Sequence, residues 1–182
     1  NQFDLYNSGG LDICFMGALE VDCQGNVNAH RGPGAFAGIG GFANITAKTP
    51  TVVFCLTFDT KGLEVSQKKG VVTIEKEGTI PKFVKKVSAV SFSAKRAIAN
   101  GQKVLYVTER CVFRLTPKGL KLIEAYPGID VQRDVLEHLP FDVVDLKYFV
   151  REAELSFDCV IDRIKRDSIL KSEYNYYEEE KA

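Results

Sequence analysis

Short apolar segments of strand length constrain the fold more than any other feature of this sequence. Residues 51–58 form the clearest predicted strand, because they are rich in β-branched and aromatic side chains and follow a proline. Residues 13–16 are apolar at every position, which predicts a strand covered on both faces. Even the longest apolar stretches are far shorter than the roughly 20 residues that a helix needs to cross a bilayer, so we expect no membrane insertion.

The rest of the chain predicts further strands and a few short helices. Strands are predicted at 103–108, 111–115 and 120–125, and a meander of short strands, including 87–93, at 63–93 at one end of the sheet. Helices are predicted at 42–45, at 94–100 before Gly101, and at 130–139 with Asp130 as the N-cap. We therefore predict an α/β fold, an open mixed β-sheet flanked by helices, at 1–149, and a helical extension with an acidic tail at 150–182.

Charge and cysteine content narrow the function classes. The 24 basic residues balance 24 acidic ones, so no net field draws the chain to nucleic acid or to an anionic membrane. The five cysteines are odd in number, widely spaced and without a C-x-x-C pair, which disfavours a disulfide framework and a zinc site: Cys14, Cys23, Cys55, Cys111 and Cys159. Three of them lie in apolar runs, as reduced thiols of a cytoplasmic protein do. We expect no metal and no resident cofactor.

A glycine-rich segment is the main candidate for chemistry. Five glycines lie between positions 32 and 41, and closely spaced glycines can turn consecutive backbone N–H groups toward one point. Such a loop can hold a carboxylate or an oxyanion, although a purely structural loop remains an alternative. The spacing is not that of a Rossmann fingerprint, and no Gly-Lys-Ser or Gly-Lys-Thr follows as in a P-loop.

Seven short motifs in a fixed order carry a resemblance to a known family. They are GGLD at 9–12, MGALEVD at 16–22, GNVN at 25–28, GIGGF at 38–42, VVFC at 52–55, TERCVF at 108–113 and PGID at 127–130. Together they resemble the carboxyl-terminal, beta-like portion of family I coenzyme A transferases of the acetate and propionate type. The resemblance extends from about residue 3 to about residue 142.

The resemblance implies a ping-pong transfer of CoA from an acyl-CoA to a small carboxylate, such as acetate, propionate or acetoacetate, through a glutamyl-CoA thioester. It assigns substrate binding to Gly38, Ile39, Gly40, Gly41 and Phe42, with CoA as cosubstrate. The family's nucleophilic glutamate lies upstream of the matched segment. We therefore expect no catalytic residue in this chain, no activity of the chain alone, and a partner in the amino-terminal half of the enzyme or in another subunit of an oligomer.

Other polar residues allow weaker hypotheses. Glu20 lies in a strand-like segment, and Glu109 is interpreted as part of a structural ion pair or of a sheet-edge site. His30 could act in acid–base chemistry or simply be exposed, and His138 suits the end of a helix. Seven basic residues could approach the CoA phosphates or form a solvated face: Lys68, Lys69, Lys82, Lys85, Lys86, Lys95 and Arg96. The alternatives to a transferase are a subunit of a CoA-dependent lyase or hydrolase, and a non-catalytic domain for assembly or ligand binding.

Overall fold

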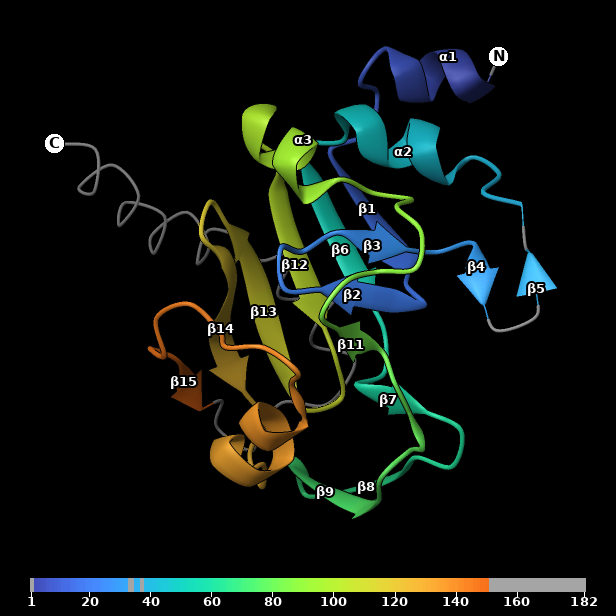
Figure 1. Ribbon diagram of the computed structural model, residues 1–182. Helices are drawn as coiled ribbons and strands as arrows, with labels where there is room; N and C mark the ends of the chain where they lie inside the picture. The colour runs from blue at the N-terminus through green and yellow to red at the C-terminus, as the bar shows by residue number, and fades with distance from the viewer. Residues whose placement is uncertain (1, 33–34, 37, 151–182) are drawn as a thin grey trace, which may run out of the picture.

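A six-stranded mixed sheet forms the centre of the molecule (Figure 1). The computed structural model describes residues 2–32, 35–36 and 38–150. The sheet has the order β1 (Ile13–Gly17), β6 (Thr51–Cys55), β12 (Lys103–Val107), β13 (Cys111–Thr116), β14 (Gly119–Ala125) and β15 (Phe149–Val150). Strands β1, β6 and β12 are parallel, β12, β13 and β14 are antiparallel, and β15 is parallel to β14. The predicted open mixed sheet of the α/β class is confirmed.

Aromatic side chains fix the packing at the middle of this sheet. The register places Phe54 of β6 opposite Tyr106 of β12, and their rings stack with centroids 5.5 Å apart. The Phe92 ring meets the Phe54 ring edge-on with centroids 5.0 Å apart. Phe42, at the start of helix α2 (Phe42–Lys48), stacks on Phe54 with centroids 6.1 Å apart. Apolar side chains on both faces of β6 are therefore buried, as its continuous apolar sequence predicts.

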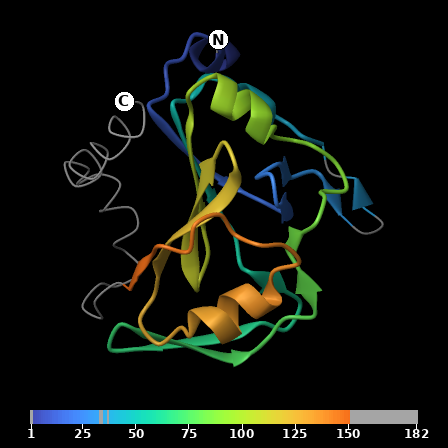
Figure 2. The ribbon, with the colours of Figure 1, turned by 60° about the vertical axis from the view of Figure 1, so that its left-hand side comes forward.

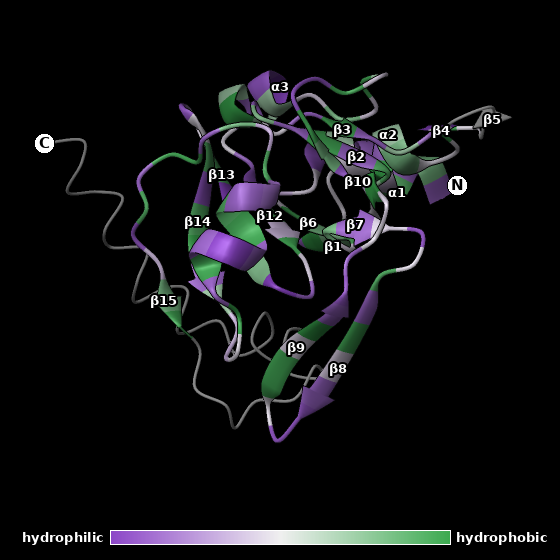
Figure 3. Ribbon diagram, turned by 60° about the horizontal axis from the view of Figure 1, so that its bottom comes forward, coloured by the Kyte–Doolittle hydropathy of each residue, from purple (hydrophilic) through white to green (hydrophobic). Residues whose placement is uncertain are grey.

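Four smaller sheets surround the central one. Strand β2 (Glu20–Asp22) pairs with β3 (Val27–Asn28) and β11 (Phe83–Val84), β4 (Arg31–Gly32) with β5 (Ala35–Phe36), β7 (Asp59–Thr60) with β10 (Ile80–Pro81), and β8 (Glu64–Lys68) with β9 (Val71–Lys76). The predicted meander does contain short strands, but in the described structure none of them joins the central sheet. Figure 3 shows the β8–β9 hairpin extending away from it.

The strand predicted at 87–93 is wrong. This segment forms one isolated bridge, between Phe92 and Val27. The amide of Ser88 donates instead to the carboxylate of Glu20 at 2.8 Å, and the amide of Ser91 donates to the carbonyl of Val27 at 2.8 Å. Side-chain acceptors and single backbone contacts thus replace a strand ladder here.

Three helices lie at one end of the sheet, and two short helical turns lie at the other (Figures 1 and 2). The helices are α1 (Gln2–Asn7), α2 (Phe42–Lys48) and α3 (Ala94–Ala99), and the turns are η1 (Val131–Val135) and η2 (Leu136–His138). Asp130 caps η1 as predicted, accepting from the amide of Arg133 at 3.1 Å, but the helix has a wide π turn and a 3₁₀ turn instead of regular α geometry. In the described part of the chain, no helix has the length and apolarity to cross a membrane.

The β8–β9 hairpin is anchored by one backbone contact. The amide of Val72 donates to the carbonyl of Pro127 at 2.8 Å, in the turn that precedes η1.

The extension and acidic tail predicted at 150–182 lie outside the described residues, apart from Val150, which ends β15.

Candidate functional site

The glycine loop at 38–41 lies between β5 and α2, and its amides have no acceptor among the described residues. Gly40 has φ +52°, a left-handed conformation that favours glycine, and a Cβ at Gly38 or Gly40 would meet nothing within 4 Å. The amide of Phe42 donates to the carbonyl of Ile39 at 3.2 Å. Among the described residues, the amides of Gly38, Ile39, Gly40 and Gly41 donate to no acceptor. These amides remain able to bind an anionic or carbonyl oxygen.

The side chains of the predicted site residues point in different directions. Ile39 is 39% exposed, whereas Phe42 is 7% exposed and stacks on Phe54 in the core. Phe42 therefore offers the loop only its backbone. A different aromatic residue approaches the loop, because Cε1 of Phe3 lies 3.8 Å from the position that a Cβ on Gly41 would occupy. Nothing in the sequence indicates this contact, since Phe3 belongs to a separate helix 38 positions before Gly41.

A buried asparagine shapes the chain that leads into the glycine-rich segment. Asn28 is fully buried, and its Nδ2 donates to Oε2 of Glu20 at 2.9 Å, to the carbonyl of Arg31 at 2.7 Å and to Oγ of Ser88 at 3.1 Å. Its Oδ1 accepts from the amides of His30 at 3.1 Å and Arg31 at 3.0 Å. One side chain thus satisfies the backbone of the turn between β3 and β4.

Glu20 is a hydrogen-bond acceptor in this cluster. Its carboxylate accepts from Asn28 and from the amide and hydroxyl of Ser88, the last at 2.7 Å. Burial tends to raise the pKa of Glu20, but these donors and the charge of Arg31 outweigh it, so its pKa lies below its ordinary value. Each of these contacts stabilises the ionised carboxylate in place, which does not favour Glu20 as a nucleophile.

His30 contacts a serine. Its Nδ1 lies 2.6 Å from Oγ of Ser91, and the same oxygen accepts from the amide of Ala29 at 2.8 Å. Those contacts hold the half-buried imidazole against the loop that precedes α3.

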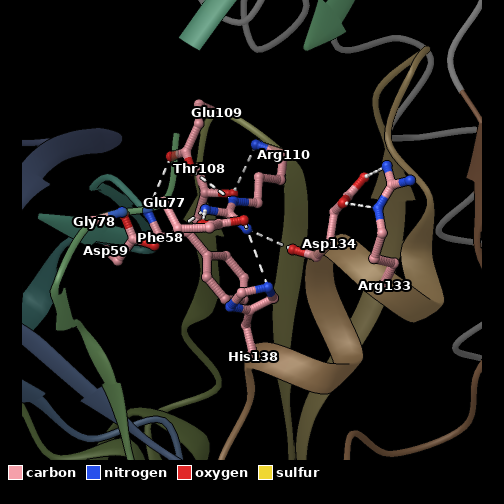
Figure 4. A network of polar contacts seen from close by, with 10 residues as sticks. All are labelled: Phe58, Asp59, Glu77, Gly78, Thr108, Glu109, Arg110, Arg133, Asp134 and His138. Carbon is pink, nitrogen blue, oxygen red and sulfur yellow. Dashed lines mark hydrogen bonds and ion pairs between the residues drawn. The ribbon is translucent and has the colours of Figure 1, made fainter. Parts of the chain in front are cut away.

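Arg110 organises the second polar cluster, at the other end of the sheet (Figure 4). Its side chain is 0% exposed. The guanidinium donates to Glu109 at 2.9 Å, to Asp59 at 3.2 Å, to both carboxylate oxygens of Glu77, and to the carbonyl of Asp134 at 2.7 Å. The guanidinium carbon also lies 4.7 Å from the centre of the Phe58 ring.

The carboxylates around Arg110 have structural partners of their own. Glu109 also accepts from the amide of Phe58 at 2.9 Å, so its interpretation as part of a structural ion pair is confirmed. Burial and the neighbouring Glu77 carboxyl raise the pKa of Asp59 above its ordinary value. Burial opposes the ionisation of Glu77 as well, but hydrogen bonds from Arg110 hold its pKa below the ordinary value. His138 lies at the end of η2 and faces Glu77, with Nε2 3.5 Å from Oε1.

This second cluster is a structural centre. The described residues contain no group of three or more His, Cys, Asp or Glu side chains that could hold a metal ion. The basic residues predicted to approach CoA come from different elements: Lys68 ends β8, and Lys95 and Arg96 lie in α3. Lys82 donates to the carbonyl of Ala18 at 3.3 Å.

Comparison with known proteins relates the chain to CoA-transferases. No protein-family model matches it. It is 41% identical over 144 residues to the acetate CoA-transferase YdiF of Escherichia coli (strain K12), and 44% identical over 146 residues to a caffeate CoA-transferase of Acetobacterium woodii. The alignments cover 79% and 78% of this chain but 27% and 28% of the relatives. The chain thus spans about a quarter of the length of these curated relatives.

A solved structure extends the similarity to the fold. The acyl-CoA transferase YdiF of Escherichia coli O157:H7, in its apoenzyme form, superposes with a TM-score of 0.80 at 38% identity. The superposition covers 84% of this chain and 30% of that chain. The same protein has also been solved as a thioester complex with CoA.

Proposed function

The chain belongs to the family I CoA-transferases, as a carboxyl-terminal portion, and from that premise we propose that it helps a complete enzyme move CoA from a short-chain acyl-CoA to a small carboxylate. The observation that carries the proposal is the glycine loop, whose amides at 38–41 donate to no described acceptor. Acetate, propionate and acetoacetate are the carboxylates of the class we propose.

The reaction proceeds in two half-reactions through the enzyme's glutamate. The carboxylate attacks the thioester carbon, expels CoA thiolate and leaves a mixed anhydride. The thiolate then attacks the glutamyl carbonyl carbon, which releases the acyl group as a carboxylate and leaves a glutamyl-CoA thioester. A second carboxylate reverses these steps and leaves as the new acyl-CoA. The CoA thioester complex solved for the relative YdiF supports such an intermediate.

The loop supplies hydrogen-bond donors where negative charge develops. Each addition to a thioester or anhydride carbon converts a carbonyl oxygen into an oxyanion. One well-aimed donor to such an oxygen contributes about 3 kcal/mol to the rate. Gly40, with φ +52°, allows the backbone to present consecutive amides without a side chain in the way.

The nucleophile lies outside this chain in our proposal. Three of the described glutamates, Glu20, Glu77 and Glu109, are engaged in structural interactions. We therefore propose that the chain alone is inactive, that the amino-terminal portion or a partner subunit supplies the glutamate, and that the complete enzyme is oligomeric. The low coverage of the relatives supports a further portion, and the four free cysteines of the described residues support a cytoplasmic location: Cys14, Cys23, Cys55 and Cys111.

A matched pair of glycine substitutions tests the role of the loop. Gly40 and Gly101 both have positive φ, +52° and +66°, and a Cβ at either position would meet nothing within 4 Å. Valine is strained by the same left-handed conformation at both positions, but only Gly40 lies in the loop. In the complete enzyme, Gly40→Val should lower kcat about 100-fold with little change in KM for the acyl-CoA. Gly101→Val should leave kcat close to that of the unmodified enzyme.

Chemical trapping separates transferase from hydrolase. Borohydride or hydroxylamine should capture a CoA-dependent glutamyl adduct in the complete enzyme incubated with acyl-CoA. Equal losses in kcat and acyl-CoA affinity for Gly40→Val would contradict the oxyanion role. Release of free CoA by water, with no trapped adduct and no CoA transferred to a carboxylate, would replace the transferase with a hydrolase.

A further inference from the structure

Helix α1 carries apolar side chains that it does not bury. Its six residues, Gln2–Asn7, include none that is fully buried. Phe3 is 46% exposed and Leu5 is 50% exposed. A short helix with so little buried surface gains little from packing, and its position beside another element therefore needs specific contacts.

Specific contacts fix α1 on the start of α2. Nδ2 of Asn44, in α2, donates to Oδ1 of Asn7 at 3.2 Å. After the helix, the amide of Gly10 donates to the carbonyl of Leu5 at 3.0 Å, and Gly9 takes φ +81° to make the turn toward β1. Figure 1 shows α1 lying next to α2, and the two helices are in contact.

This arrangement places one aromatic ring at the glycine loop. Cε1 of Phe3 lies 3.8 Å from the position of a Cβ on Gly41, and the Phe3 ring meets Tyr6 edge-on with centroids 6.1 Å apart. Ile39, in the loop itself, is 39% exposed. Phe42 points into the core, and Cδ1 of Ile45 lies 3.7 Å from the same Cβ position on Gly41. Phe3, Ile39 and Ile45 are therefore large apolar side chains beside the loop, and Phe3 is the one that comes from a separate helix.

We propose that Phe3 forms an apolar wall of the acyl subsite and limits the length of the acyl chain that the enzyme accepts. The inference rests on the proposed function, because the loop amides must hold the carbonyl oxygen of the thioester. The acyl chain then extends from that carbon along the loop, where the Phe3 ring and Ile39 supply apolar contact and the ring restricts the space. Removing the ring leaves the amides in place and enlarges the subsite.

Two substitutions in the same helix test this. Phe3→Ala removes the ring beside Gly41, whereas Leu5→Ala removes an equally exposed apolar side chain whose Cδ1 lies 2.3 Å from the Cβ position of Gly10 instead. In the complete enzyme, kcat/KM is measured for acetyl-, butyryl- and hexanoyl-CoA with acetate or propionate as acceptor. Phe3→Ala should raise the ratio of hexanoyl- to acetyl-CoA by at least about tenfold. Leu5→Ala should leave that ratio unchanged.

Each outcome decides between the two proposals. An active Phe3→Ala enzyme with an unchanged ratio, or an equal shift in Leu5→Ala, overturns the role of Phe3 and leaves the transferase proposal intact. A complete enzyme that transfers CoA from none of these acyl-CoAs overturns the proposed function and with it this inference. If Phe3→Ala does not fold, Phe3→Leu keeps an apolar side chain but makes it smaller. Phe3→Leu should then raise the hexanoyl- to acetyl-CoA ratio of kcat/KM as well, and an unchanged ratio would count against Phe3 as a wall of the acyl subsite.

Discussion

Replacing Arg110 with methionine should strongly destabilise the end of the sheet that it occupies. The guanidinium is fully buried and donates to three carboxylates and one backbone carbonyl. Methionine fills similar space but leaves Asp59 and Glu109 with side chains 8% and 9% exposed and no cation against them. Removing one partner of a buried ion pair costs about 3–5 kcal/mol in the free energy of unfolding. The Glu77 side chain is 37% exposed, so solvent screens its share and we expect the lower part of that range.

The destabilisation should depend on pH, with a sign that follows from Asp59. The pKa of Asp59 is already raised by burial and by Glu77, and the loss of Arg110 raises it further. A raised folded-state pKa contributes stability that is fully present below the ordinary value, about 3.9, and is lost as the pH rises through the raised value. The difference between the variant and the unmodified protein should therefore be smaller at pH 5 than at pH 8.

Amide hydrogen exchange of β13 and β14 in the complete enzyme gives the measurement, because it reports the free energy of local opening. Arg133→Met is the matched control, since Arg133 pairs with Asp134 at 2.6 Å but its side chain is 69% exposed. It should change exchange far less than Arg110→Met. An Arg110→Met enzyme whose β13 and β14 amides exchange as slowly as before, or no faster than in the control, would refute the reasoning.

Two further substitutions probe close packing, beside those of Gly40 and Phe3. Gly128→Ala should lower the thermal unfolding midpoint by several degrees, because Gly128 has φ +92° and a Cβ would lie 2.3 Å from the carbonyl oxygen of Val72. An unchanged midpoint would show that the β8–β9 hairpin moves aside at little cost. Tyr106→Phe should lower the free energy of unfolding by about 1–3 kcal/mol, because the buried Tyr106 hydroxyl donates to the carbonyl of Gly25. Urea unfolding measures this loss, and a smaller loss would show that water reaches the Gly25 carbonyl in the variant.

Local chemistry made much of the fold predictable. Strands β6, β12 and β13 follow from β-branched and aromatic runs, and the cap at Asp130 follows from its side-chain oxygen. The segment 87–93 has the same strand-like composition, but its backbone pairs with a side chain and with single backbone groups more than 60 positions away, as in the contacts of Ser88 with Glu20 and of Ser91 with Val27. A local sequence pattern does not show that distant acceptors will replace the hydrogen bonds of a strand.

The site was predictable only in its backbone. Glycine spacing predicted a loop whose consecutive amides can turn toward one point, because the absence of a Cβ is itself the relevant property. The neighbours of the loop depend on tertiary packing: the approach of Phe3 requires α1 to fold back over α2, and Phe42 turns inward because Phe54 offers a ring to stack on. Likewise an ion pair was one of the two roles predicted for Glu109, but nothing in the sequence indicates the contact of Arg110 with Asp59, 51 positions away.

The position of Arg110 has a consequence for how this chain reaches its native state. Its acceptors on Asp59, Glu77 and Asp134 lie 51, 33 and 24 positions away along the chain. A folding intermediate that buries the guanidinium before these segments have packed against it would hold an unpaired charge away from water, which costs free energy. The cluster should therefore form late and all at once, so that the β7 region, the end of the hairpin and the η1 turn join the strands as one cooperative unit and half-built intermediates are disfavoured.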